Sequence, residues 1–148
     1  MAKYVIDTHA LVWLLSNPVR LGHEARKAFR DEKSEFYIVN YVFEEIRRKY
    51  EKYKRDNINK GAIKIPPIIC WVISKKCKNV RTYKLSQGEI KNWSNKFKMS
   101  SELKKISKDD WPIVIMYLIL KQRYPRAEIK IISDDNYIRS NSSVRTCW

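Results

Sequence analysis

The sequence has few of the residues that mark extended, cross-linked or membrane-spanning proteins. Its 148 residues include only 3 glycines and 5 prolines, which excludes collagen-like and low-complexity classes. The 3 cysteines, Cys70, Cys77 and Cys147, form no C-x-x-C pair and favour buried thiols in a reducing compartment over a disulfide scaffold or zinc site. The longest apolar run, residues 111–120, is about half the ~20 residues that cross a bilayer, so we expect no membrane association.

Acidic residues are also scarce relative to basic ones. Asp and Glu number 16 against 31 Lys and Arg, which gives a formal net charge of +15. Such a surplus attracts polyanions through long-range potential and counterion release, and nucleic acid is the expected polyanion in a cytoplasm. The alternative, in which excess lysine merely solvates the surface, stays open on composition alone.

Length and hydrophobicity predict one globular domain that spans residues 1–148. The hydrophobic fraction is 44% and the aromatic fraction 12%, enough for a core and too much for a disordered chain. The first residues reach Asp7 too soon to contain the apolar core of a signal peptide. We therefore expect a cytoplasmic protein.

Strand-like and helix-like segments alternate along the chain, which predicts an α/β fold. Such alternation is typical of a mainly parallel sheet with helices on both faces. Residues 86–89 have the pattern of a capping box, which begins a helix that continues to about residue 98. The expected strands are residues 4–6, 36–39, 80–84, 128–133 and 144–147, and the other expected helices are residues 9–15, 23–30, 41–55, 68–76 and 111–123.

Acidic residues follow two of the expected strands. Asp7 comes directly after the first strand, and Asp134 and Asp135 come after residues 128–133. Functional sites of open parallel sheets lie outside the carboxyl ends of the strands. If these two strands are neighbours, acids from opposite ends of the sequence meet at one edge of the sheet.

Two further acids occupy positions beside the expected core. Glu45 lies at the edge of the apolar face of the helix expected over residues 41–55, whereas Glu44 points to solvent. Asp110 directly precedes the most apolar helix. Burying a carboxylate is costly unless a cation or hydrogen bonds compensate it. The pattern predicts a converging set of four acids, Asp7, Glu45, Asp110 and Asp135.

Four carboxylates in one place require a cation, and hard oxygen ligands suit Mg²⁺ or Mn²⁺. Such an ion lowers the pKa of a bound water and holds phosphate oxygens, as phosphodiester hydrolysis requires. Arg48, Lys49 and Lys52 follow Glu45 on its side of the helix, where they are placed to bind flanking phosphates. Tyrosines interleaved among these cations suit single-stranded RNA or DNA.

Each acid also has a purely structural interpretation. Asp7 and Asp110 are placed to cap the helices that follow them, and Glu45 is placed to pair with Lys49 four residues later. The pair Asp134 and Asp135 is compatible with an ordinary turn. The sequence alone leaves both interpretations open for every one of these acids.

The segment Tyr4-Val-Ile-Asp7-Thr8-His9-Ala10-Leu-Val-Trp-Leu-Leu15 resembles the opening of PIN-domain nucleases, particularly the VapC-like toxins of type II toxin–antitoxin pairs. The similarity continues in the family's order through residues 21–28, 43–46, 110–113, 131–135 and 144–148. It therefore covers essentially the whole chain.

This resemblance implies a three-layer α/β/α sandwich around a central, mainly parallel sheet, and Mg²⁺-dependent endoribonuclease activity. It further implies a homodimer and a small antitoxin protein that blocks the site. By position, the family's catalytic acids correspond to Asp7, Glu45, Asp110 and Asp135, with Asp134 as the alternative to Asp135, and its supporting hydroxyl corresponds to Thr8.

The chain departs from the family pattern at two places. Val42 stands where many relatives have Ser or Thr one turn before the helix Glu, and Trp111 stands where many have Arg after the third Asp. Two other functions remain compatible with the sequence. One is a PIN nuclease that matures ribosomal RNA, and the other is an RNA-binding module that has kept the fold but lost catalysis.

Overall fold

In the computed structural model, residues 1–56 and 79–148 are described, except for the side chains of residues 50–56. The described residues form one five-stranded sheet in the order β3-β2-β1-β4-β5, and every neighbouring pair is parallel. The strands expected from the sequence are therefore confirmed. They are β1 (Ala2–Ile6), β2 (Glu35–Val39), β3 (Val80–Tyr83), β4 (Glu128–Ile132) and β5 (Thr146–Cys147).

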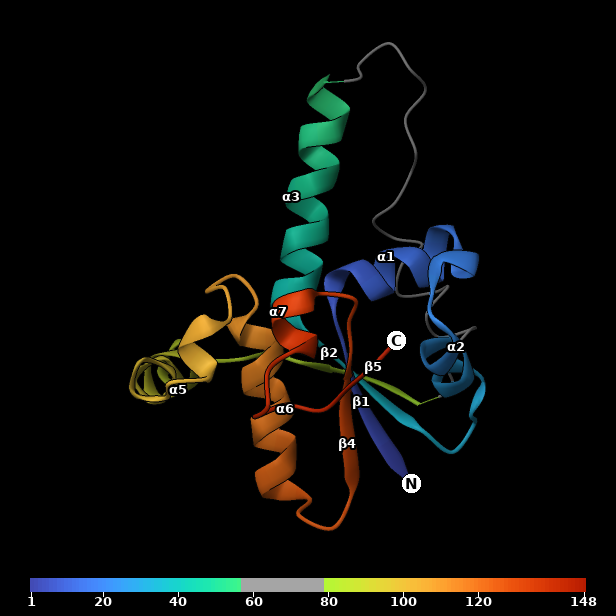
Figure 1. The fold of residues 1–148 in the computed structure, drawn as a ribbon. Coiled ribbons are helices and arrows are strands. Elements are labelled where there is room, and N and C mark those ends of the chain that lie inside the picture. The colour runs from blue at the N-terminus through green and yellow to red at the C-terminus, as the bar shows by residue number, and fades with distance from the viewer. Residues whose placement is uncertain (57–78) are drawn as a thin grey trace.

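Helices cover both faces of this sheet. Figure 1 shows α1 (Thr8–Ser16) and α2 (His23–Arg30) on one side, and α5 (Gln87–Met99) and α6 (Trp111–Arg123) on the other. The α/β/α sandwich is thereby confirmed, whereas the helix expected over residues 68–76 lies outside the described residues. The remaining helices are α3 (Asn40–Asp56), α7 (Asn136–Arg139) and the short 3₁₀ turns η1 (Pro18–Arg20) and η2 (Leu103–Lys105).

Helix α6 is the most deeply buried helix of the described chain. Its side chains from Trp111 to Tyr117 are all buried, and it packs against β1, β2 and β4. Pro112 lies in the first turn, where its missing N–H breaks no helical hydrogen bond. Within the described ranges, no helix combines the length and the apolar character that spanning a bilayer requires.

The capping box at the start of α5 is present as the sequence predicts. The Ser86 hydroxyl accepts a hydrogen bond from the Glu89 N–H at 3.1 Å, and the Ser86 N–H donates to Glu89 Oε2 at 2.8 Å. These two bonds satisfy N–H groups that have no partner within the helix. Local side-chain chemistry therefore sets where α5 begins.

Strands β1 and β4 lie side by side in the middle of the sheet, although they are far apart in the sequence. Ile6 is paired with Ile132, and the Asp7 N–H continues the pairing by donating to the Ile132 carbonyl at 3.1 Å. The strand order reverses between these two strands. From β1 the chain adds β2 and β3 toward one edge of the sheet, and it then returns to add β4 and β5 toward the other edge. Functional sites of open parallel sheets lie at such a switch point, outside the carboxyl ends of the strands, which here are the ends of β1 and β4.

Candidate functional site

Asp7 lies at the switch point, directly after β1. It is the N-cap of α1 and its side chain is buried, with the residue only 4% exposed. Its Oδ1 accepts a hydrogen bond from the Thr8 N–H at 2.6 Å, and its Oδ2 accepts one from the Ser133 hydroxyl at 2.6 Å. Burial raises the pKa of Asp7 above its ordinary value despite these hydrogen bonds. Asp7 therefore caps α1 as expected, and its carboxylate is held inside the protein.

Ser133 connects the ends of β1 and β4. It is fully buried, and its hydroxyl donates to Asp7 Oδ2 while accepting a hydrogen bond from the Asp135 N–H at 3.0 Å. Sequence reasoning missed this residue as part of the site. The signal available in the sequence was a hydroxyl directly after a buried strand and directly before the two acids Asp134 and Asp135.

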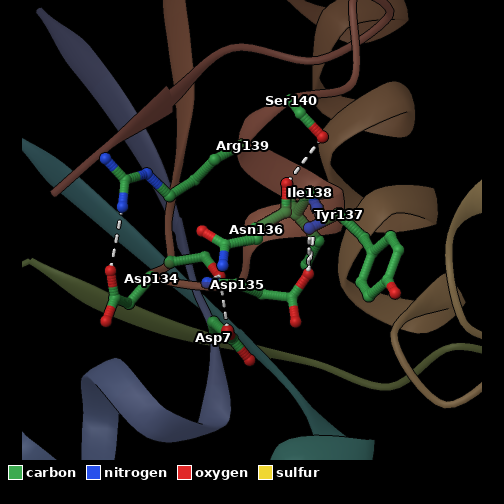
Figure 2. Close-up of polar contacts among 9 residues, drawn as sticks. Asp7, Asp134, Asp135, Asn136, Tyr137, Ile138, Arg139 and Ser140 are labelled. Atoms are coloured by element: carbon green, nitrogen blue, oxygen red, sulfur yellow. Dashed lines mark hydrogen bonds and ion pairs between the residues drawn. The ribbon is translucent and has the colours of Figure 1, made fainter.

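Asp134 and Asp135 point to different sides of the turn that follows β4 (Figure 2). Asp135 is the N-cap of α7, and its Oδ1 accepts from the N–H groups of Tyr137 and Ile138 at 2.8 and 2.9 Å. Asp134 instead forms an ion pair with Arg139 at 3.0 Å, near the surface. The backbone N–H of Asp135 binds the same Ser133 hydroxyl as the Asp7 carboxylate, and the Asp135 carboxylate is the one of the pair whose charge acts on Asp110.

Glu45 reaches the same region from α3. Val42 and Ile46 are buried, Glu44 is exposed and Glu45 is half-buried, as the helical projection predicts. Glu45 Oε2 accepts a hydrogen bond from the Thr8 hydroxyl at 2.5 Å, and Oε1 forms an ion pair with Lys49 at 2.7 Å. Burial opposes ionisation, but the bonds from Lys49 and Thr8 hold the pKa of Glu45 below its ordinary value. Thr8 thus joins two of the predicted acids, since its N–H binds Asp7.

Asp110 is the acid whose negative charge is least stabilised by hydrogen bonds or cations. It occupies the N-cap position of α6, but its side chain makes no capping hydrogen bond. Burial, followed by the charges of Asp7, Asp135 and Glu45, raises the pKa of Asp110 from 3.8 to about 7. The structure thus brings Asp7, Glu45, Asp110 and Asp135 close enough to affect one another electrostatically.

These acids fit a divalent cation by their chemistry. They supply hard oxygen ligands. The negative charges of its neighbours help to raise the pKa of Asp110, and a bound cation would offset this repulsion. Their present orientations, however, serve other partners, namely Lys49, Ser133 and backbone N–H groups. Among the described side chains, those of residues 1–49 and 79–148, no three from His, Cys, Asp or Glu are arranged to hold a metal ion as they stand.

A cleft of about 480 Å³ opens between the first turns of α3 and α6, beside these acids. Arg48 and Lys49 line it together with Glu45, whereas the side chain of Lys52 is outside the described residues. Sequence reasoning missed Tyr41 and Lys108 as part of this surface, because only the packing of α6 against the sheet brings its first turn to α3. The lining residues are Tyr41, Glu45, Arg48, Lys49, Lys108, Asp109, Pro112 and Ile113.

Comparisons with known proteins yield a structural match. No protein-family model and no curated protein sequence matches the chain. A chain from the crystal structure of VapBC2 from Rickettsia felis bound to a DNA fragment from their promoter superposes with a TM-score of 0.60. The match covers 98% of this chain and 97% of that chain, at 9% sequence identity. The likeness therefore shows that this chain has the PIN-like α/β fold that its sequence predicted.

Proposed function

We propose that the protein is a metal-dependent endoribonuclease that hydrolyses RNA phosphodiester bonds. The observation that carries this proposal is the meeting of Asp7, Glu45, Asp110 and Asp135 at the switch point of the sheet. These acids come from four separate segments of the chain, so their proximity is a property of the tertiary fold. A cleft of about 480 Å³ whose lining includes Arg48, Lys49 and Lys108 lies directly beside them.

The four acids are assigned to hold Mg²⁺ or Mn²⁺, with Asp135 preferred to Asp134. The ion, when bound, supplies an activated water and charge stabilisation at the phosphate. Thr8 and Ser133 are positioning residues, because their hydroxyls fix the carboxylates of Glu45 and Asp7. Lys49 balances part of the charge of Glu45 in the metal-free protein. Arg48 and Lys49 on the cleft, together with Lys52, are assigned to bind the RNA backbone.

The biological role that we propose is that of the toxin in a toxin–antitoxin pair. It is supported by the fold-level likeness to VapBC2 and by the resemblance of the first fifteen residues to VapC-like toxins. On this proposal, the protein works in the cytoplasm as a homodimer and binds a cognate antitoxin that blocks the site. A reading frame of antitoxin size beside its gene favours this role, whereas its absence favours ribosomal-RNA processing.

A second candidate function is RNA binding without cleavage. The arrangement of the acids favours it, because within the described residues they do not form a closed metal site as they stand. The two functions differ in one measurable property, which is whether RNA is cut when Mg²⁺ or Mn²⁺ is present.

The decisive experiment is cleavage of a mixed RNA pool with Mg²⁺ or Mn²⁺, with EDTA as the metal-free control. We expect Glu45→Gln to abolish cleavage and Glu44→Gln to leave it unchanged, since Glu44 is exposed one position away on the same helix. Asp7→Asn is a second inactive variant. Its unfolding must be measured alongside, because the amide is unable to accept the Ser133 hydroxyl and the Thr8 N–H with both of its terminal atoms.

Three outcomes distinguish the possibilities. Metal-dependent cleavage that Glu45→Gln removes supports the nuclease. Equal cutting by wild type and both Glu45→Gln and Asp7→Asn assigns the activity to another site or to contamination. RNA binding without cutting in either metal, unchanged by Asp7→Asn, supports the binding module and excludes the nuclease.

A further inference from the structure

Most of the residues that line the cleft between α3 and α6 are not among the four acids. It shares Glu45 with the acidic site, and its residue Asp109 precedes Asp110. Whatever occupies it therefore lies directly beside the proposed point of cleavage. Its volume of about 480 Å³ falls within the range usual for sites that hold a small organic group.

One wall of the cleft is aromatic and apolar. Tyr41 is half-buried in the first turn of α3, and the buried residues Pro112 and Ile113 lie on the α6 side. The preceding residue is held in place, because Asn40 Oδ1 accepts a hydrogen bond from the Leu85 N–H at 3.1 Å. The backbone that carries Tyr41 is therefore fixed to the segment between β3 and α5. A partly exposed ring at a fixed position is suited to stack on a flat ligand.

The rest of the cleft carries the cations of Arg48, Lys49 and Lys108 together with the carboxylates of Glu45 and Asp109. Lys49 is already paired with Glu45, but Lys108 is exposed, and no carboxylate of the described residues is within ion-pair distance of its ammonium. Arg48 lines the same cleft from α3. A ring next to these cations matches the flat base and the negative phosphate of a nucleotide.

We propose that this cleft is a nucleotide subsite for single-stranded RNA, in which Tyr41 stacks on one base and Lys108 and Arg48 bind its phosphates. The inference rests on the proposed function for the choice of RNA, and it adds a residue that selects unpaired strands. A base stacked on Tyr41 needs an open face, and bases inside a duplex have none. The nucleotide in the subsite flanks the bond at the acids.

The test is fluorescence anisotropy of a labelled, single-stranded RNA of about ten nucleotides with the full-length protein in EDTA, followed by a gel that verifies that the RNA is intact. We expect Tyr41→Leu to weaken binding about 5- to 100-fold, and Tyr41→Phe to stay close to wild type because it keeps the ring. Lys108→Ala is expected to lower the slope of log affinity against log salt by about 0.7. Lys27→Ala, an exposed lysine on α2, serves as the matched control and is expected to leave the slope unchanged.

The same RNA annealed to its complement provides the second arm. We expect the duplex to bind more weakly and to be insensitive to Tyr41→Leu. Wild-type affinity in both Tyr41→Leu and Lys108→Ala would overturn the subsite, and an equal loss on the duplex would overturn its preference for single strands. Because binding is measured without metal, RNA binding that depends on Tyr41 supports the subsite even if the cleavage assay excludes the nuclease.

Discussion

Replacing Asp110 by asparagine is expected to stabilise the metal-free protein at neutral pH while removing its activity. The Asp110 side chain makes no capping hydrogen bond, so the amide forfeits no bond that the carboxylate made. What the substitution removes is a half-buried negative charge beside Asp7, Asp135 and Glu45. Functional sites often retain groups that cost stability in this way.

The magnitude follows from the pKa of Asp110. The difference between its ordinary value of 3.8 and about 7 in the folded protein corresponds to at most about 4 kcal/mol. Because the group is partly open to solvent, screening reduces the expected effect to about 1–2 kcal/mol. For a protein of this size that is a rise in Tm of about 5 °C.

The sign of the pH dependence is set by the raised pKa. Below pH about 4, Asp110 is protonated in both the folded and unfolded states, and the folded state suffers no penalty. Between pH about 4 and about 7, Asp110 loses its proton in the unfolded chain but keeps it in the folded protein. The free energy of unfolding therefore falls as pH rises through this range. The advantage of Asp110→Asn should therefore be small at pH about 4 and complete above pH about 7.

Thermal unfolding followed by circular dichroism in EDTA, from pH about 4.5 to about 8, measures this dependence. Adding Mg²⁺ should raise the Tm of the wild type more than that of Asp110→Asn, because the ion stabilises only the protein that binds it. A variant that is less stable than wild type at pH about 8, or a difference that is independent of pH, would refute the reasoning.

Three further predictions test other parts of the structure. Asp135→Asn should reduce cleavage far more than Asp134→Asn, since the charge of the Asp135 carboxylate acts on Asp110 whereas Asp134 is paired with Arg139; equal losses in the cleavage assay would contradict this assignment. Gly22→Ala should lower stability by about 1–3 kcal/mol in urea unfolding, because an added Cβ would lie 2.1 Å from the Trp148 carbonyl carbon; an unchanged midpoint would be inconsistent with that contact. RNA affinity should fall steeply between ~50 and ~200 mM salt, and a flat response in a filter-binding titration would count against the basic surface.

Much of the fold follows from local sequence patterns. Helix α6 begins at Trp111 and ends at Arg123 as predicted, because its residues are apolar on most faces and Pro112 is tolerated only in a first turn. The bounds of α2 (His23–Arg30) were likewise predicted from its apolar spacing. Helix α7 was missed because four residues carry no periodic signal, and its start depends on hydrogen bonds to Asp135.

The sequence predicted which acids belong to the candidate site, and the fold showed how they are arranged. Glu45 was identified because a helical projection separates it from Glu44, and the structure places the two on the sides expected. Asp134 and Asp135 were not separable in the sequence, since both follow the same strand. The hydrogen bonds of α7 and the ion pair to Arg139 distinguish them, and both depend on how the turn is folded.

The sequence by itself determined the positions of most helices and strands, the basic surface and the list of acids that stand beside apolar segments. These properties are encoded over a few neighbouring residues, through hydrophobic spacing and helix capping. Only the tertiary structure decided that β1 and β4 are adjacent with Ile6 opposite Ile132, which places Ser133 against Asp7 across 126 positions of sequence. Helix α6 packs against both strands, and no local pattern specifies which distant strand end becomes the neighbour of another.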